Sequence, residues 1–423
     1  MQDNLQPEPA ETDNGTEKPA PRPLVVWGGR LGSIVFGLLL AWFLVELLLR
    51  LLFFSLPPRL QLILDDVRVT PFTDKKLLPD PIWQDDNEFL TITRPVQDRE
   101  QYGSADVHFS VTTEQMWDSR LAFRTTSAQT DMRWDGVAVG DSFTFCFTEI
   151  DDCWVTRFGE VTGRNIINLG ITGTGAVSHL RVMQQFGLPG QPPLVLWQWY
   201  CNDANEDYGL ARLDSSLQRP DMPPLDDDAP AALTLNWWDR NSAAYVLIKM
   251  LVGADEAFEA SWQFLDREHA QSGDIDLSFG RPYLWGAFDM DRPQNVFGWG
   301  LSRDAMLAAR DELARGYENG STGTLLIVLM PTKEQVYRDL AAPLLEADQM
   351  ALLDTNYQMM LDFCTSEGLW CVDPLPTFQQ AAAAGEQLYY KTDIHLNPRG
   401  NEVLAEFLVG ELTDWLEENP TDG

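Results

Sequence analysis

The chain has 423 residues, of which 44% are hydrophobic, and its formal net charge is -34 at pH 7. This length and composition are sufficient for one large globular domain with additional segments. The acidic excess excludes a nucleic-acid partner, because phosphate binding requires clustered Lys and Arg side chains. It also disfavours docking along an anionic lipid surface, and we interpret it as a source of solubility.

The N-terminal part of the sequence predicts a membrane anchor. Residues 1–30 include a stretch rich in Pro, Glu and Gln, which predicts a disordered tail. Residues 31–56 form an apolar run that is long enough, as a helix, to cross a hydrocarbon core of about 30 Å. Glu46 and Arg50 interrupt this run, but their spacing stacks them as an ion pair on a helix. No small-residue cleavage pattern follows, so we expect an uncleaved signal anchor rather than a removed signal peptide.

Basic residues on the two sides of the apolar run favour one orientation in the membrane. Lys18, Arg22 and Arg30 precede the run, whereas Arg59 and Arg68 follow it, which is a slight excess on the N-terminal side. We therefore expect a cytoplasmic N-terminus and an extracytoplasmic domain, either periplasmic or extracellular. The lipid bilayer is then a partner of the chain through this single helix.

The sequence after the anchor divides into two parts. Residues 57–133 alternate short apolar runs with Pro, Asp and Thr, which predicts irregular β-structure in a membrane-proximal segment. Residues 134–423 alternate strand and helix patterns, which is typical of an α/β domain with a parallel sheet covered on both faces. The strands are expected at residues 136–139, 165–169, 194–199, 324–329 and 369–372. Ligands bind at the carboxyl ends of such strands, which draws attention to Ser142, Gly173 and Asn202.

An insertion is expected after the third of these strands. Residues 204–301 begin with an acidic, Pro-rich stretch and end in sequence rich in Gly and aromatic residues. A helical stretch is expected between them, at residues 242–263. We interpret the whole segment as an insertion that flanks the active site.

The five cysteines leave two alternatives open. Cys146 and Cys153 are seven residues apart, and so are Cys364 and Cys371, while Cys201 is left over. Each close pair can form a disulfide in an oxidising compartment. The alternative is that these residues are small buried side chains. No CxxC or HxxxH spacing occurs in the sequence, so we expect no zinc site.

Among the four histidines, His395 has the sequence context of a catalytic base. It lies in a polar loop two residues after Asp393, so the carboxylate can bind one imidazole nitrogen and leave the other for a nucleophile. His179 falls in a predicted helix and is expected to be structural, and the other two are expected at the surface. Ser142 stands beside a glycine at the end of a strand, where a nucleophile is expected.

Four sequence blocks together resemble the SGNH (GDSL-like) hydrolase family. In chain order the matching blocks are Val139-Gly140-Asp141-Ser142, residues 168–175, Tyr200-Cys201-Asn202-Asp203 and residues 393–400. They cover roughly residues 134–410 in the family's order. The resemblance implies a flavodoxin-like three-layer α/β/α fold, preceded here by one N-terminal transmembrane helix. It also implies a membrane-anchored bacterial branch similar to the SGNH domains of polysaccharide O-acetyltransferases and esterases.

Two features depart from the family's common pattern. The spacing Asp393-x-His395 is one residue shorter than usual and is found in relatives similar to the bacterial polysaccharide O-acetyltransferases. Tyr200 stands where the family usually has glycine, and we expect it to narrow the acyl pocket. Asp141 and Asp203 are expected to brace loops, and Lys333 is expected to form a salt bridge at the start of a helix.

The resemblance also implies a role for each matching residue. Ser142 would be the nucleophile, His395 its general base and Asp393 the acid that orients the imidazole. The oxyanion hole would consist of the backbone N–H groups of Ser142 and Gly173 and the side-chain amide of Asn202, with Gly170 as an alternative second donor. No cofactor and no metal is implied.

The implied activity is hydrolysis of an ester, expected to be an O-acylated carbohydrate or another cell-envelope ester. A polysaccharide O-acetyltransferase with the same triad is an open alternative, because hydrolysis and transfer share the acyl-enzyme. A second alternative is a non-catalytic, membrane-tethered glycan-binding protein that has kept the fold.

Overall fold

The computed structural model describes residues 23–56, 60–61, 64, 66–77, 82–102, 106–116, 120–224, 236–252 and 266–420. A five-stranded sheet in the order β12-β11-β8-β6-β7 forms the centre of the domain, and all of its neighbouring strands pair in parallel. The strands are β6 (Gly136–Val139), β7 (Ile166–Asn168), β8 (Leu194–Trp199), β11 (Thr324–Leu329) and β12 (Cys371–Val372). Counted from β6, this is the flavodoxin-like order 2-1-3-4-5, so the predicted SGNH-like α/β fold is confirmed.

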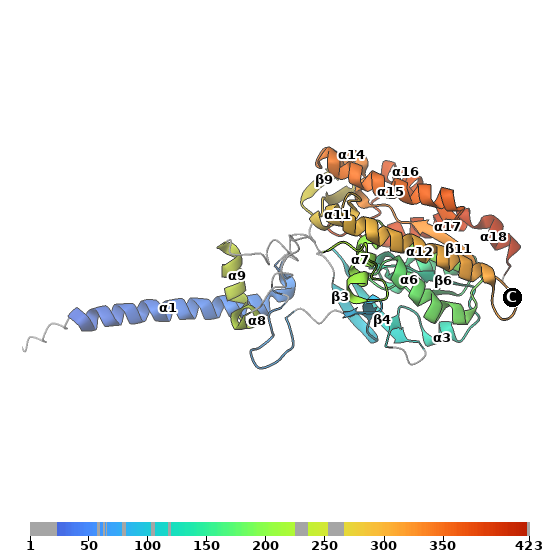
Figure 1. Cartoon of the computed structure of the whole chain (residues 1–423). Helices are drawn as coiled ribbons and strands as arrows, with labels where there is room; N and C mark the ends of the chain where they lie inside the picture. The colour runs from blue at the N-terminus through green and yellow to red at the C-terminus, as the bar shows by residue number, and fades with distance from the viewer. Residues whose placement is uncertain are drawn as a thin grey trace, which may run out of the picture.

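The apolar runs of the sequence form this sheet because both of its faces are covered. Every residue of β6 and β8 is buried, which explains why these strands lack the alternation of a half-exposed strand. On one side α5 (Trp154–Thr162) packs against α17 (Pro398–Glu411), and elsewhere α12 (Pro293–Arg315) packs against α6 (Ala176–Val182) and α7 (Asp203–Leu213). Figure 1 shows helices in front of and behind the strands. Further helices are α3 (Ser127–Thr130), α4 (Ser142–Phe145), α11 (Pro282–Phe288), α13 (Lys333–Val336), α14 (Arg338–Ala341), α15 (Ala347–Glu367), α16 (Leu375–Ala383) and α18 (Thr413–Glu418).

The segment before the sheet contains the expected β-structure. β1 (Trp83–Asp86) pairs with β2 (Leu90–Thr93), and a second small sheet contains β3 (Val96–Tyr102), β4 (His108–Gln115) and β5 (Ala122–Phe123). These strands lie against the central domain. The Thr91 hydroxyl, for example, donates a hydrogen bond of 3.3 Å to the carbonyl oxygen of Gly173.

The ends of the expected insertion belong to the central fold. α7 and α12 overlap residues 204–301 at either end and cross closely at Gly298, where a Cβ atom would meet the Ala204 carbonyl oxygen at 1.8 Å. Between them lie α8 (Trp237–Asn241), α9 (Ala243–Leu251), β9 (Glu268–Ser272) and β10 (Ile275–Phe279). The helix expected over 242–263 is present as α9, whereas residues 253–263 lie outside the described part of the chain.

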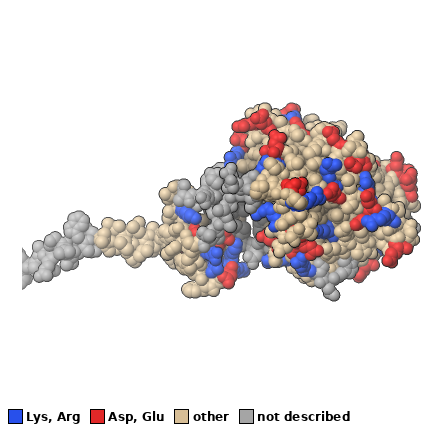
Figure 2. Space-filling model, viewed as in Figure 1, with Lys and Arg blue, Asp and Glu red and all other residues tan. Residues whose placement is uncertain are grey.

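The N-terminal helix α1 (Pro23–Leu51) is longer than the sequence predicts. It begins inside the segment that we assigned to a disordered tail, because Pro23 is compatible with the first helical position; residues 1–22 lie outside the described residues. Among the described helices, one is long and apolar enough to cross a membrane, over Leu31–Leu51 with a mean hydropathy of 2.3. An anchor and an N-terminal signal sequence share these properties. In Figure 2 this helix projects from the domain, and most of it carries no charged side chain.

Both close cysteine pairs form disulfides, which decides between the two alternatives left open by the sequence. Cys146 bonds to Cys153 with a Cα–Cα distance of 5.6 Å, and Cys364 bonds to Cys371 with a Cα–Cα distance of 6.1 Å. The first bridge closes the loop after α4, and the second joins α15 to β12. Cys201 is a buried free thiol.

Candidate active site

The carboxyl ends of β6 and β8 lie side by side where the strand order changes direction. Open α/β sheets bind their ligands at this position, because the chains leaving the two strands diverge and leave a crevice. Ser142 follows β6 as the first residue of α4, and Asn202 follows β8 as the N-cap of α7. Gly173 lies in the loop after β7. The topology therefore brings three of the predicted residues to the same edge of the sheet.

The turn that carries Ser142 is fixed by buried hydrogen bonds. The Asp141 carboxylate caps α4 by accepting from the Phe143 N–H at 2.9 Å, and the Asp141 N–H donates to the Gln198 side chain at 2.9 Å. Ser142 itself is partly exposed. Its N–H is at the first helical position and has no acceptor within the helix, so it is oriented to receive a negative charge.

The loop with His395 brings an imidazole to this serine. His395 Nε2 lies 2.7 Å from Ser142 Oγ, while His395 Nδ1 is hydrogen-bonded to Asp393 Oδ1. The same carboxylate oxygen accepts from the His395 backbone N–H at 3.0 Å. Gly400 permits this loop to pack closely, since a Cβ there would lie 2.0 Å from the Leu388 carbonyl oxygen. The structure thus brings Ser142, His395 and Asp393 into one hydrogen-bonded chain.

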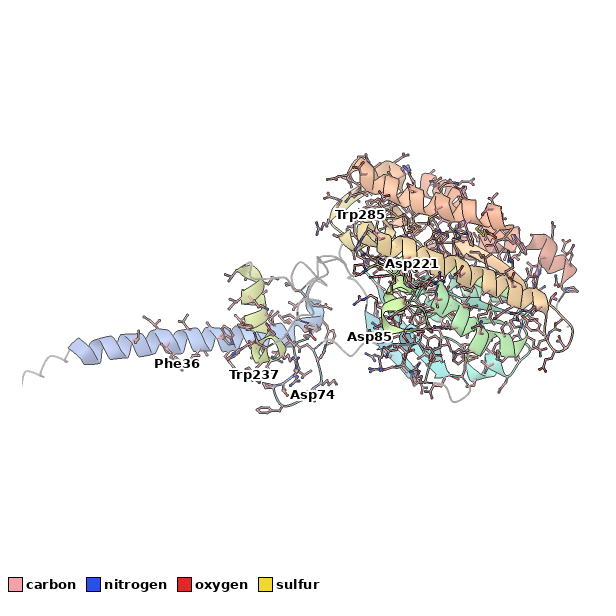
Figure 3. All side chains as sticks on the ribbon, in the orientation of Figure 1. Phe36, Asp74, Asp85, Asp221, Trp237 and Trp285 are labelled. Carbon is pink, nitrogen blue, oxygen red and sulfur yellow. A yellow bond between two sulfur atoms is a disulfide. The ribbon has the colours of Figure 1, made fainter. Side chains whose placement is uncertain are left out.

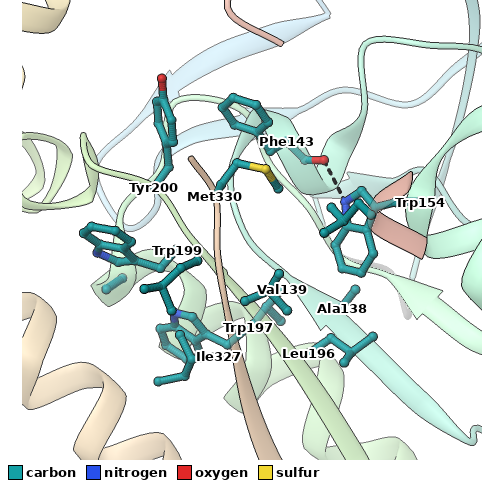
Figure 4. Close-up of a cluster of buried hydrophobic side chains, with 14 of the residues drawn as sticks. Ala138, Val139, Phe143, Trp154, Leu196, Trp197, Trp199, Tyr200, Ile327 and Met330 are labelled. Carbon is teal, nitrogen blue, oxygen red and sulfur yellow. Dashed lines mark hydrogen bonds between the residues drawn. The ribbon is translucent and has the colours of Figure 1, made fainter. Parts of the chain in front are cut away.

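Two phenylalanine rings contact the imidazole. The ring centroids of Phe143 and Phe147 lie 5.0 and 4.0 Å from that of His395. Phe147 belongs to the loop closed by the first disulfide. Tyr200 is only 1% exposed and packs on Phe143 with a centroid distance of 4.6 Å, as Figure 4 shows. Its ring is thus part of the core behind the nucleophile, and its expected narrowing of the acyl pocket stays a prediction.

Cations from distant parts of the chain surround Asp393. Burial raises the pKa of its carboxyl group, but the charge and hydrogen bond of His395 and the charge of Arg281 outweigh burial and hold this pKa well below its usual value. Arg281 Nη2 lies 4.0 Å from Asp393 Oδ2. Lys333 Nζ donates to the Asp393 carbonyl oxygen at 3.0 Å and to Asp266 at 2.7 Å. Asp266 also accepts from Arg281 at 3.3 Å, so it balances part of both positive charges.

The sequence did not predict the contact of Arg281 with Asp393, and for Lys333 it predicted only a salt bridge at the start of a helix. Lys333 does form a salt bridge at the start of a helix, but the partner is Asp266 in the inserted segment and the side chain is fully buried. The position of Lys333 shortly after the strand expected at residues 324–329, at the carboxyl edge of the sheet, was the usable signal. Nothing in the sequence around Arg281 indicates that it approaches the loop with Asp393 and His395.

The candidate oxyanion donors differ in how far they are already engaged. The Gly170 N–H donates to Asn168 Oδ1 at 2.9 Å, which favours Gly173 as the second backbone donor. Asn202 Nδ2 lies 3.3 Å from the Tyr283 hydroxyl oxygen and 3.4 Å from Glu206 Oε1. An amide nitrogen carries two hydrogens, and here each of them has an acceptor. An oxyanion would have to displace one of these two long contacts, so the role of Asn202 as a donor stays a prediction.

Buried acids lie beneath these donors. Burial raises the pKa of Asp141 to about 6 and the pKa values of Glu206 and Asp207 to about 7. The pKa of Asp203 is raised well above its usual value, also chiefly by burial. Neither carboxyl oxygen of Asp203 has a hydrogen-bond partner among the described residues, so the expected loop-bracing contact is not seen. The nearby His179 is neutral, because burial lowers its pKa to about 3.

Part of the chain matches a known family. Residues 304–421 match the family model described as the SGNH hydrolase-like domain of the acetyltransferase AlgX. This segment includes β11, Lys333 and the loop with Asp393 and His395. The resemblance to SGNH hydrolases that the sequence motifs predict is thereby confirmed. No curated protein matches the chain.

Several solved structures resemble the chain at low identity. A lipolytic protein of the G-D-S-L family from Veillonella parvula has 11% identity and a TM-score of 0.34, covering 66% of this chain and 97% of its own. The acetylxylan esterase Axe2 from Geobacillus stearothermophilus has 10% identity and a TM-score of 0.34, covering 66% of this chain and 93% of its own. LAE5, an alpha/beta hydrolase from the metagenome of Lake Arreo, has 12% identity and a TM-score of 0.33, covering 65% and 93%.

Proposed function

We propose that the chain is a membrane-anchored serine esterase that acts on an O-acylated carbohydrate or another cell-envelope ester. The observation that carries the proposal is the hydrogen-bonded chain from Ser142 Oγ through His395 to Asp393. A nucleophile, a base and an orienting acid in this order are the requirements for acyl-enzyme chemistry. A tethered protein without catalysis would not need this arrangement.

The proposed reaction proceeds through an acyl-enzyme. His395 Nε2 takes the proton from Ser142 as Oγ attacks the ester carbonyl carbon, and the ionised Asp393 stabilises the imidazolium that forms. The N–H groups of Ser142 and Gly173 and the Asn202 amide bind the oxyanion, each donor lowering the barrier by about 3–4 kcal/mol. The imidazolium then protonates the leaving alkoxide. Water, activated by His395, attacks the acyl carbon and releases the acid and the free serine.

Acyl transfer is the second candidate, and one observation favours it specifically. Residues 304–421, which carry Asp393 and His395, match the domain of an acetyltransferase. In a transferase a sugar hydroxyl replaces water as the group that attacks the acyl-enzyme. The triad serves either acceptor equally, so the choice depends on which one binds beside the acyl-serine.

The test is turnover of para-nitrophenyl acetate and covalent labelling by a fluorophosphonate probe. We expect Ser142→Ala to abolish labelling and to reduce kcat by at least roughly a thousandfold. Ser302→Ala is a matched control, since this buried serine bonds Asp207 and lies outside the triad. Labelling and turnover that persist in Ser142→Ala would refute the proposal. An added glycan acceptor that takes up acetyl groups faster than water does would favour the transferase.

The proposed localisation is a single span with the N-terminus in the cytoplasm and the catalytic domain outside it. The apolar helix over Leu31–Leu51 supports a membrane segment. The two disulfides support an oxidising compartment for the domain, because thiols in a reducing compartment are kept reduced.

A further inference from the structure

Two charged residues near the end of α1 are bound by another part of the chain. Glu46 accepts hydrogen bonds from the Ser242 hydroxyl at 2.9 Å and from the next two backbone N–H groups at 3.1 and 2.9 Å. Arg50 pairs with Glu46 at 2.5 Å and donates to the Asn241 carbonyl oxygen at 2.9 Å. The carboxylate therefore caps α9, and the guanidinium binds the end of α8. The charges that interrupt the apolar run hold these two short helices against α1.

Apolar packing accompanies this capping. Ala243 is buried against Leu49 and Phe53 of the N-terminal segment, and Val246 and Leu247 pack against the same cluster. These residues of α9 recur at helical spacing, so they form one face of the helix. α9 thus packs on the C-terminal end of α1 through one face of the helix and through its own N-terminus.

The opposite side of the helix pair is also apolar and is exposed. Trp237 and Trp238 of α8 are 56% and 51% exposed, and Ile248, Leu251 and Val252 are 45%, 73% and 74% exposed. Figure 3 shows Trp237 at the base of α1, far from Trp285 on the catalytic domain.

α9 carries one charged side chain. This is Lys249, and its ammonium group binds Asp239 of α8 at 3.2 Å. A helix that is apolar on all sides is normally covered by protein or by lipid.

The position of α9 fits a bilayer interface. Figure 1 shows α9 crossing α1 steeply, so if α1 follows the bilayer normal, α9 lies close to the membrane plane. Glu46 precedes the end of the apolar span at Leu51 by five residues, which is about 7.5 Å along a helix. Interfacial helices bury their apolar faces about 5–10 Å deep, and Trp side chains are enriched at that depth.

We propose that α8 and α9 form an interfacial helix pair that lies in the outer leaflet beside α1, with Trp237, Trp238 and Leu251 in contact with lipid. The inference rests on the proposed span of α1. The acids do not oppose it, because Glu46 and Asp239 are both paired with cations. Arg240 of α8 is exposed, and its long side chain can extend toward the headgroups. The partner is the headgroup and acyl boundary of the bilayer. The catalytic domain is then held at the membrane by two segments that are distant in the sequence.

Tryptophan quenching by brominated lipids tests this contact in the full-length protein. The protein is reconstituted in phosphatidylcholine vesicles with bromine at a shallow or a deep acyl position. We expect Trp237→Phe/Trp238→Phe to reduce the quenched fraction, more strongly with shallow bromine. Trp42→Phe reports the span itself and should also reduce it. Trp285→Phe, in α11 of the catalytic domain, is the matched control and should leave quenching unchanged.

The two possible failures are distinguishable. If Trp42→Phe reduces quenching and the Trp237/Trp238 double variant does not, the helix pair lies outside the lipid and the inference is overturned while the span stands. A protein partner or a second copy covering the two tryptophans would give this same result. If neither variant changes quenching, α1 does not cross the bilayer, and both proposals fall. Far-ultraviolet circular dichroism checks that every variant is folded.

Discussion

Asp393 is buried, yet its low pKa keeps the carboxylate ionised through the neutral range. Two of the groups that stabilise this charge come from outside the histidine loop. Arg281 approaches the carboxylate, and Lys333 binds the backbone of the same residue. Burying an anion costs free energy that a single cation does not fully offset, so Arg281 and Lys333 together stabilise the ionised carboxylate. Asp266 in turn balances part of the charge of these two cations. We therefore predict that Arg281 is a positioning residue, which would act on the proposed reaction through Asp393.

Replacing Arg281 should change the pH profile of the enzyme. The acid limb of the kcat/KM profile reports proton uptake by the coupled Asp393–His395 pair. The charge of Arg281 opposes this uptake, so in Arg281→Gln the pair takes up its proton, and activity is lost, at a higher pH. We expect the acid limb of the kcat/KM profile to move up by about one pH unit. Arg281→Lys should restore most of the original profile, since it returns the charge. Arg292→Gln, at an arginine that binds the Gly286 carbonyl oxygen, is the control. An unchanged acid limb in Arg281→Gln would contradict the role.

At the scale of elements, α7 is unusual for the acids that it buries. Asp203, Glu206 and Asp207 all have raised pKa values, with burial as the largest cause. A folded-state pKa above the unfolded value means that the folded protein holds its proton more tightly. The associated stability is complete below the unfolded pKa and is lost as pH rises toward the folded one. For Asp207 this window runs from 3.8 to about 7.

Asp207→Asn should therefore flatten the dependence of stability on pH. The amide mimics the protonated carboxyl group but does not titrate, so the thermal unfolding midpoint should fall less between pH 4 and pH 7. One proton accounts for about 1.4 kcal/mol per pH unit within that window. Asp214→Asn is the matched control at the end of α7, where Ser216 and Arg181 lower the pKa despite partial burial. It should lose stability at neutral pH instead, and equal pH slopes in the two variants would contradict the assignment.

Sequence patterns predicted the central elements well because short-range chemistry determines them. Continuous apolar runs identified β6, β8 and β11, and the four motif blocks identified Ser142 and His395. Arg281 and Lys333 are separated by 111 and 60 residues from their partners in the histidine loop, and no local pattern reports such contacts. The sequence predicted a start of α1 at residue 31, whereas the helix begins at Pro23. The apolar residues just after Pro23 adjoin a polar, Pro-rich stretch, and the prediction therefore included them in the disordered tail. The ion pair of Glu46 and Arg50 was expected from spacing, but its use in docking α9 was not.

At the scale of the whole molecule, the proposed anchor α1 also shares a polar junction with α8 and α9 of the inserted segment. Glu46→Leu/Arg50→Leu would make the span more apolar while removing the cap of α9. We expect tryptic cleavage at Lys249 in reconstituted protein to become roughly tenfold faster, since losing a cap costs about 1 kcal/mol and the ion pair adds to it. Leu39→Ala, in an exposed part of α1, is the control and should not change cleavage. Unaltered cleavage in the double variant would show that α9 docks without these charges.

The contact between α1 and α9 also bears on the order in which the parts of the site are completed during synthesis of the chain. β6 to β8, with Ser142, are synthesised before the segment that returns to α1, and β11, β12 and His395 are synthesised after it. The proposed nucleophile and its proposed base therefore meet only once the chain has passed the point at which it can fold back on α1. Any nascent fragment that stops short of His395 carries a serine without a base. The proposed acyl-enzyme chemistry is in this way reserved for chains whose synthesis has passed α8 and α9.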